Sequence, residues 1–138
     1  MKSIKLIALV GFFPALVLAQ NTPNMIGTWS GTFTNTVMGT AAHHVAPNKK
    51  DDEIYFNKNI PFNLVIDRQE QASFSGTLST AKHKEVILGA IAPDLQGGVM
   101  VDGDGTHSFK IIDANTIQNC YVQISKPKVA GCWIGKRK

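Results

Sequence analysis

Cysteine is scarce in this sequence, and the motifs of several enzyme classes are missing. The chain has two cysteines in 138 residues, and they do not form the Cys-x-x-Cys pair typical of thiol redox enzymes. The serine-rich segment at 73–79 lacks the nucleophile-elbow pattern of hydrolases. The Asp-Gly-Asp-Gly segment at 102–105 lacks the later acidic ligands of an EF-hand calcium loop. No catalytic motif is therefore recognisable from local sequence.

A long transmembrane run is also missing. The apolar stretch at 6–18 is shorter than the ~20 residues of a membrane-spanning helix. It follows Lys2 and Lys5 and ends in a small-residue cleavage site, so we predict a signal peptide at 1–19. No cysteine follows that site, which excludes a bacterial lipoprotein anchor. We expect a single domain at 20–138, located in the periplasm or secreted, with no stable membrane anchor.

Charge of one sign is not in excess once the leader is removed. The chain has fourteen Lys and Arg against ten Asp and Glu, and the leader contains two of the basic residues. The mature domain then has twelve basic and ten acidic residues. The basic residues form no stripe, and the last three residues, 136–138, read as a solvated tail. We therefore predict no nucleic-acid partner.

Helical periodicity is almost absent, whereas period-two alternation recurs throughout the mature chain. In 27–35, Trp29 and Phe33 alternate with threonines and serine, which predicts a strand with one apolar face. Eight such segments are separated mostly by short turns: 27–35, 61–67, 72–79, 85–92, 97–102, 106–112, 116–124 and 128–135. Short links favour antiparallel neighbours, so we predict an all-β, eight-stranded up-and-down barrel. The alternative is a two-sheet β-sandwich, which usually needs long crossing connections.

The two cysteines give an independent indication for the last hairpin. Cys120 and Cys132 lie symmetrically about Lys126, so a turn centred there places them opposite each other. In an exported protein such a pair normally forms a disulfide. We predict a structural disulfide rather than a reactive thiol.

A secreted eight-strand meander that opens with Gly27-Thr28-Trp29 resembles the lipocalin and avidin barrels, the calycin group. This resemblance implies that Trp29 plugs the closed end of the barrel and that an arginine near the chain's far end covers it, for which Arg137 is the candidate. The avidin residues that contact biotin and the lipocalin Thr-Asp-Tyr turn are missing. The resemblance therefore implies a shape and no particular ligand.

The inward face of the barrel is predicted from the alternation. If Trp29 points inward, a mostly apolar interior follows, with Phe33, Phe62, Leu64, Phe74, His107 and Phe109 as ligand-contacting candidates. The seventh segment allows two choices. Either Cys120, Val122 and Ile124 face inward and give a dry core, or Asn119, Tyr121 and Gln123 do. The second choice adds Tyr121 to the site and leaves an outer apolar face, Val122, Ile124, Ala130 and Ile134, on which copies could associate as a homo-oligomer.

The long connection at 37–59 is predicted to be a polar lid over the open end. It contains His43 and His44, but adjacent histidines on an extended chain point in opposite directions, and zinc needs three or four ligands. His83 and His107 could contribute only if the fold brought them close. We therefore predict no specific metal site and no cofactor.

Three functions remain in order of preference. The first is an exported barrel that binds a small, mostly apolar molecule. The second is a barrel enzyme of isomerase or cyclase type that uses His107 or Tyr121 as acid or base. The third is a protein-binding barrel such as an exported protease inhibitor. Apolar interior positions outnumber candidate catalytic groups, so binding is the preferred function and catalysis is not expected.

Overall fold

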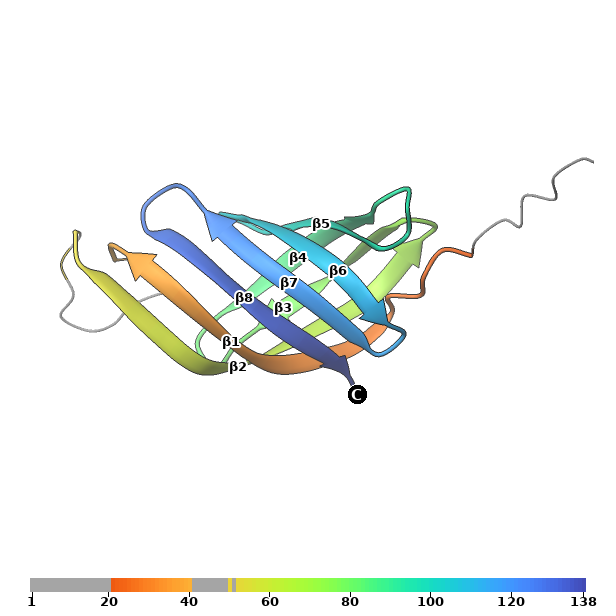
Figure 1. The fold of residues 1–138 in the computed structure, drawn as a ribbon, viewed down its shortest axis with the longest axis horizontal. Coiled ribbons are helices and arrows are strands. Elements are labelled where there is room, and N and C mark those ends of the chain that lie inside the picture. The colour runs from red at the N-terminus through yellow and green to blue at the C-terminus, as the bar shows by residue number, and fades with distance from the viewer. Residues whose placement is uncertain (1–20, 41–49, 51) are drawn as a thin grey trace, which may run out of the picture.

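The computed structural model describes residues 21–40, 50 and 52–138 of the chain. In this part of the chain eight β-strands follow one another without a helix (Figure 1). The strands are β1 (Gly27–Met38), β2 (Ile54–Glu70), β3 (Ser73–Ser79), β4 (Lys84–Ile91), β5 (Gly97–Val101), β6 (Thr106–Asp113), β7 (Thr116–Gln123) and β8 (Lys128–Arg137). The described residues contain no helix long and apolar enough to cross a bilayer.

Each strand pairs antiparallel with its neighbour in sequence, and β8 returns to pair with β1. The closing seam runs from Trp29 opposite Arg137 to Met38 opposite Lys128. Closure satisfies the backbone groups that an open sheet would leave at its edges. The predicted eight-stranded up-and-down barrel is thus confirmed, and the sandwich alternative is wrong.

The predicted lid is wrong at both of its ends, because β1 continues to Met38 and β2 already begins at Ile54. The cause is a β-bulge at Asn59, which has a positive φ of 55° and shifts the alternation by one residue. Before the bulge Tyr55 points inward and is 7% exposed, whereas Phe56 is 69% exposed. A period-two pattern extended back from Phe62 gives the opposite orientation, which hides this part of the strand from sequence analysis.

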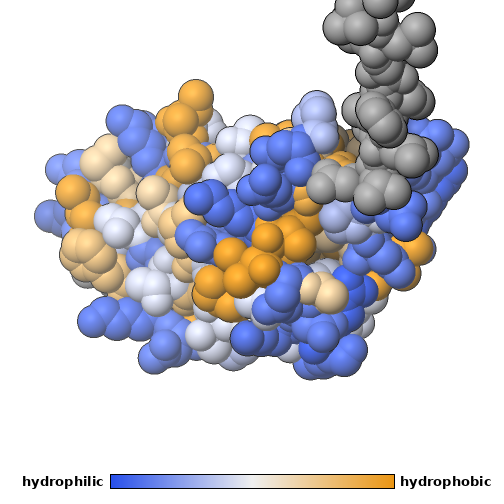
Figure 2. All heavy atoms as spheres, turned by 45° about the vertical axis from the view of Figure 1, so that its right-hand side comes forward, coloured by the Kyte–Doolittle hydropathy of each residue, from blue (hydrophilic) through white to orange (hydrophobic). Residues whose placement is uncertain are grey.

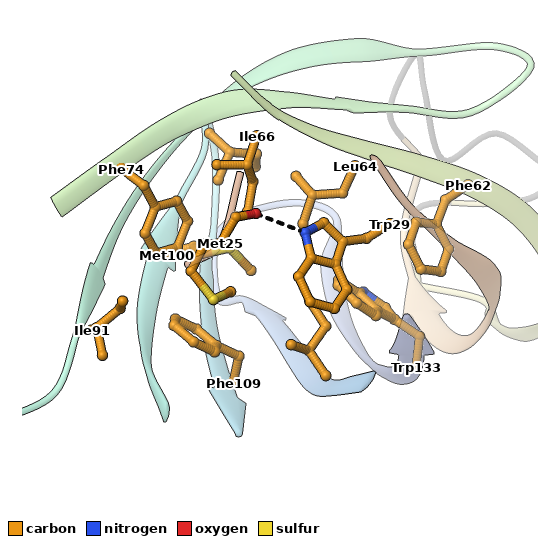
Figure 3. Packing of buried hydrophobic residues seen from close by; sticks show 12 residues of the cluster. Met25, Trp29, Phe62, Leu64, Ile66, Phe74, Ile91, Met100, Phe109 and Trp133 are labelled. Carbon is orange, nitrogen blue, oxygen red and sulfur yellow. Dashed lines mark hydrogen bonds between the residues drawn. The ribbon is translucent and has the colours of Figure 1, made fainter. Parts of the chain in front are cut away.

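An apolar core fills the half of the barrel in which β1 begins and β8 ends, and Figure 3 shows how its side chains pack. Its centre is Trp29, which is almost fully buried and donates a hydrogen bond from Nε1 to the Met25 carbonyl at 2.9 Å. Met25 is itself held by a hydrogen bond from its N–H to Gln69 Oε1 at 2.7 Å. The segment before β1 is thereby folded under the barrel and closes this end.

The two glycines beside Trp29 make room for other parts of the chain rather than for the indole. A Cβ on Gly27 would lie 3.2 Å from the Arg137 guanidinium, and a Cβ on Gly31 would lie 2.2 Å from the Ile134 carbonyl oxygen. Arg137 stacks over Trp29, with its guanidinium carbon 4.2 Å from the ring centroid. Its nitrogens also donate to the carbonyl oxygens of Asn24, Ile26 and Ala114, so it ties the C-terminus to both neighbouring segments.

The last hairpin carries the predicted disulfide. Cys120 lies directly opposite Cys132 in the β7–β8 register, and the two sulfur atoms are bonded. Among residues 118–124 the buried side chains are Asn119 and Gln123, whereas Val122 is exposed and Ile124, just beyond β7, is 85% exposed. Of the two orientations left open by the sequence, the structure therefore has the one that places polar groups and Tyr121 on the inner side.

Candidate functional site

A cavity of about 280 Å³ occupies the half of the barrel opposite Trp29. It lies among the ends of β1 and β2, the β3–β4 connection and the β5–β6 turn, on the side away from the C-terminus marked in Figure 1. The lining side chains are Phe33, Asn35, Asn57, Ile60, Pro61, Leu78, Thr80, Ala81, Lys82, His83, Glu85, Asp102, His107, Tyr121 and Trp133, with Gly131. Ala81 and Lys82, in the β3–β4 connection, line the cavity and are exposed, so this connection borders its opening.

The cavity has an apolar floor. Trp133 packs against Phe62 with ring centroids 4.4 Å apart, and Phe62 in turn lies 6.5 Å from Phe33. Ile60 and Leu78 extend this apolar surface up the β2 and β3 side. A ligand entering from the mouth would meet Trp133 and Phe33 as the upper layer of the core.

Only part of the predicted ligand-contacting set reaches this cavity. Phe33, His107 and Tyr121 line it. Phe62, Leu64, Phe74 and Phe109 instead belong to the packed core around Trp29, where each is buried. Alternation identifies which side chains point inward, but it does not tell how far along the barrel axis the core extends. The cavity therefore contains fewer of these inward-pointing aromatic and aliphatic side chains than the alternation alone indicates.

A buried polar network stands behind the floor. His107 and Asp102 have side chains only 2% exposed, and His107 Nε2 lies 3.0 Å from Asp102 Oδ2. The Asn119 amide satisfies all its neighbours when its oxygen accepts from His107 Nδ1 at 2.9 Å and from Trp133 Nε1 at 3.1 Å. Both nitrogens of His107 are thus engaged inside the protein. The network fixes the Trp133 indole that forms the floor.

Asp102 is held in its charged form by its surroundings. Burial acts to raise the pKa of Asp102, but hydrogen bonds from His107 and the Gly105 N–H, together with the charge of His107, outweigh burial and leave the pKa below its ordinary value. Asp102 Oδ1 also accepts from the Asp104 N–H at 3.2 Å. The carboxylate therefore orders the β5–β6 turn and orients His107 at the same time.

Tyr121 stands beside this turn, with its ring centroid 4.7 Å from that of His107. Its hydroxyl donates to Asp104 Oδ1 at 2.8 Å and lies 3.1 Å from Gln123 Oε1. Burial raises the pKa of Tyr121 well above its ordinary value, and the Asp104 hydrogen bond and the nearby carboxylates raise it further. The ring passes so close to Gly105 that a Cβ there would lie 2.2 Å from it, which explains the glycine in this turn.

The structure adds Glu85 to the site, a residue that sequence analysis missed. Glu85 Oε1 lies 2.9 Å from His83 Nε2. Its carboxylate also lies near those of Asp102 and Asp104, with one oxygen of each within 4.8 Å of the others. The signal in the sequence was a charged residue on the inner side of a strand, since Glu85 alternates with the buried Ile87 and Ile91.

A second polar pair near the opening of the cavity was also missed, because the β2 bulge hides the inward orientation of Asn57. Asn57 Nδ2 donates a hydrogen bond to Asn35 Oδ1 at 2.9 Å.

The outer surface carries exposed apolar side chains among polar ones, as one face of the molecule illustrates in Figure 2. Val122, Ile124, Ala130 and Ile134 all point outward on β7 and β8 and just beyond. On β4 and β5 the exposed apolar residues are Val86, Leu88, Val99 and Val101. Leu88 pairs with Val101 across the two strands, so this group is continuous.

Two sequence predictions lie outside the described residues. The signal peptide at 1–19 is one of them, and the histidine pair His43 and His44 is the other. The further two histidines, His83 and His107, are both in the described part of the chain. They line the same cavity, but each is paired with a carboxylate.

Comparison with known proteins adds no relative. No protein-family model matches the chain, and no curated protein matches its sequence. The closed antiparallel barrel is consistent with a lipocalin-like fold, and the disulfide is more typical of exported proteins than of cytosolic ones. Function therefore has to be argued from the cavity itself.

Proposed function

We propose that this protein is an exported barrel that binds one small amphiphilic molecule in the cavity opposite Trp29. The observation that carries the proposal is the cavity of about 280 Å³ between an apolar floor and a polar wall. Small-molecule sites measure ~300–1,000 Å³ and combine apolar surface with a few convergent polar groups. This cavity is slightly smaller than that range, which suits a single ring with a short polar arm.

Export and a calycin-type architecture belong to the same proposal. The predicted signal peptide and the disulfide between Cys120 and Cys132 support export. The Gly27-Thr28-Trp29 motif supports the calycin relationship, because Trp29 is buried at the closed end beneath Arg137. That arrangement is the one that the resemblance implies.

Binding is favoured over catalysis by the state of the two candidate acid–base residues. His107 uses both ring nitrogens in contacts with Asp102 and Asn119, so neither nitrogen is available to a ligand. The raised pKa of Tyr121 keeps its phenol protonated, and its proton is directed at Asp104. Neither group can act as a general base in this arrangement.

The test is native mass spectrometry of protein purified from its own source. We expect a bound small molecule in the unmodified protein and in Val65→Trp, whose new side chain points outward from β2. Ile60→Trp, on the same strand but lining the cavity, should lose that molecule. A barrel that is empty in all three forms, or that retains the molecule in Ile60→Trp, would contradict the proposal.

A further inference from the structure

We infer that the ligand is a small organic cation, with a primary ammonium group at Glu85 and an apolar ring on the floor formed by Trp133 and Phe33. This inference rests on the proposed function and adds the charge and orientation of the ligand. It starts from the unequal distribution of charge and apolar surface around the cavity.

The acidic side of the cavity is formed by β4 and the β5–β6 turn. Glu85 and Asp102 both line the cavity, and Asp104 stands next to them, with the three carboxylates within 4.8 Å of one another. The oxygens of Asp102 are already used by His107 and by backbone N–H groups of the turn. Glu85 is therefore the carboxylate most able to accept hydrogen bonds from a ligand. An ammonium group has three donors and no acceptor, which suits such a wall.

The hydrogen-bonding direction of Tyr121 agrees with this charge. A phenol hydroxyl can donate or accept, and here it donates to Asp104. The carboxylates around Tyr121 disfavour a further negative charge at this position, as its raised pKa also indicates. An anionic ligand head would therefore meet repulsion at the same wall. A cationic head would meet attraction, and the Tyr121 ring could add a cation–π contact.

The basic residues of the cavity do not cancel this effect. Lys82 lines the mouth, but its side chain is exposed, so its ammonium group can remain in water. His107 is buried and its Nε2 contacts Asp102 rather than Glu85. His83 contacts Glu85 through one carboxylate oxygen, which leaves the other oxygen of Glu85 for a ligand donor.

The apolar part of the ligand is placed by the floor. Trp133, Phe33, Ile60 and Leu78 are apolar side chains that line the same cavity as Glu85. Leu78 lies directly beside Glu85 in the β3–β4 register. A ring joined to an ammonium group by a short arm would cover this surface while its charge reaches Glu85. Bare inorganic cations would leave the floor unused.

The experiment compares three probes with the same ring: 2-phenylethylammonium, 2-phenylethanol and phenylacetate. Isothermal titration calorimetry at pH 7 measures each against the full exported protein, against Glu85→Gln and against Glu70→Gln. Glu70 is an exposed carboxylate at the opposite end of the barrel and serves as the matched control. We expect the ammonium probe to bind at least ~10-fold more tightly than the alcohol, because a charged hydrogen bond is the stronger one. Glu85→Gln should remove this preference without weakening the alcohol, and Glu70→Gln should retain it.

The outcomes separate the two proposals. If the alcohol or phenylacetate binds as tightly as the ammonium probe and Ile60→Trp abolishes that binding, the cation inference is overturned and the binding function stands. If calcium binds at the carboxylates and none of the three probes binds, the cation inference is also overturned. If none of the probes binds and the protein from its own source is empty, both proposals fail.

Discussion

Asn119 offers the sharpest test of how the cavity floor is held. Asn119→Leu keeps a side chain of similar size at this buried position but removes the oxygen that accepts from His107 Nδ1 and Trp133 Nε1. Two buried donors without an acceptor cost about 2–6 kcal/mol together. Burial of the leucine side chain returns about 1.5–3 kcal/mol. From the middle of these ranges we expect the free energy of unfolding to fall by about 2 kcal/mol.

The assay is urea unfolding at pH 7, with the midpoint compared at unchanged slope. Gln118→Leu is the control, because Gln118 is the adjacent residue on the outer face and its change should stay within about 0.5 kcal/mol. A second readout is the NMR signal of the Trp133 indole N–H, which should shift in Asn119→Leu while that of Trp29 stays in place. Unchanged or increased stability, together with an unmoved indole signal, would show that the Asn119 oxygen does not hold the floor.

Three other predictions concern separate parts of the barrel. In Tyr55→Phe the only remaining tyrosine is Tyr121, and because its pKa is raised in the folded state, phenolate absorbance at 295 nm should stay low above pH ~10. The stability that the buried, protonated Tyr121 contributes is complete below pH ~10 and is lost as the pH rises further. If the tyrosine of the folded protein ionised near pH ~10, as a free tyrosine does, the burial of Tyr121 would be contradicted. Replacing Cys120 and Cys132 by alanine opens a loop with a sequence separation of 12, so urea unfolding should show a loss of about 3 kcal/mol with the strand content retained by circular dichroism; an unchanged midpoint would refute this role. Arg137→Ala removes a cation–π contact worth about 0.5–2 kcal/mol and the hydrogen bonds to the segment before β1. Amide hydrogen exchange at residues 25–27 should then accelerate more than exchange in β4. If the two regions kept the same protection as in the unmodified protein, Arg137 would not be the residue that holds this end of the barrel closed.

The fold was predictable because its evidence is repeated along the chain. Alternation recurs in every strand, and short turns leave few ways to connect them. The pairing of Cys120 with Cys132 then fixed the register of the last hairpin independently. The prediction was wrong for the end of β1 and the beginning of β2, since a single bulge at Asn59 reverses which residues of β2 before it face inward. One residue in a left-handed conformation is enough to make a strand look like a loop.

The site was less predictable, because depth along the barrel axis has no periodic signal. Phe33 and Phe74 both point inward, yet Phe33 borders the cavity and Phe74 lies in the filled half. The boundary between the packed core and the cavity depends on the volume that Trp29, Met25 and the aromatic residues around them occupy. That volume can be assigned to one end of the barrel only when the positions of the strands are known. Glu85 was missed although the sequence did contain a signal for it, namely a charged residue on the inner side of a strand.

At Glu85 the stability of the fold and the proposed affinity for a cation make opposite demands on the side chain. Carboxylates within 4.8 Å repel one another by about 1–3 kcal/mol per pair, for effective dielectric constants of about 80 to 20. The partly exposed contact between Glu85 and His83 stabilises the fold by at most about 1 kcal/mol. A glutamine at position 85 keeps a hydrogen-bond acceptor for His83 and removes the repulsion from Asp102 and Asp104, so Glu85→Gln should raise the free energy of unfolding of the ligand-free protein by at least about 1 kcal/mol. The same substitution should weaken the ammonium probe. Opposite changes in stability and affinity would mean that Glu85 is kept for a ligand, whereas a parallel loss of both would make it a structural residue of the barrel.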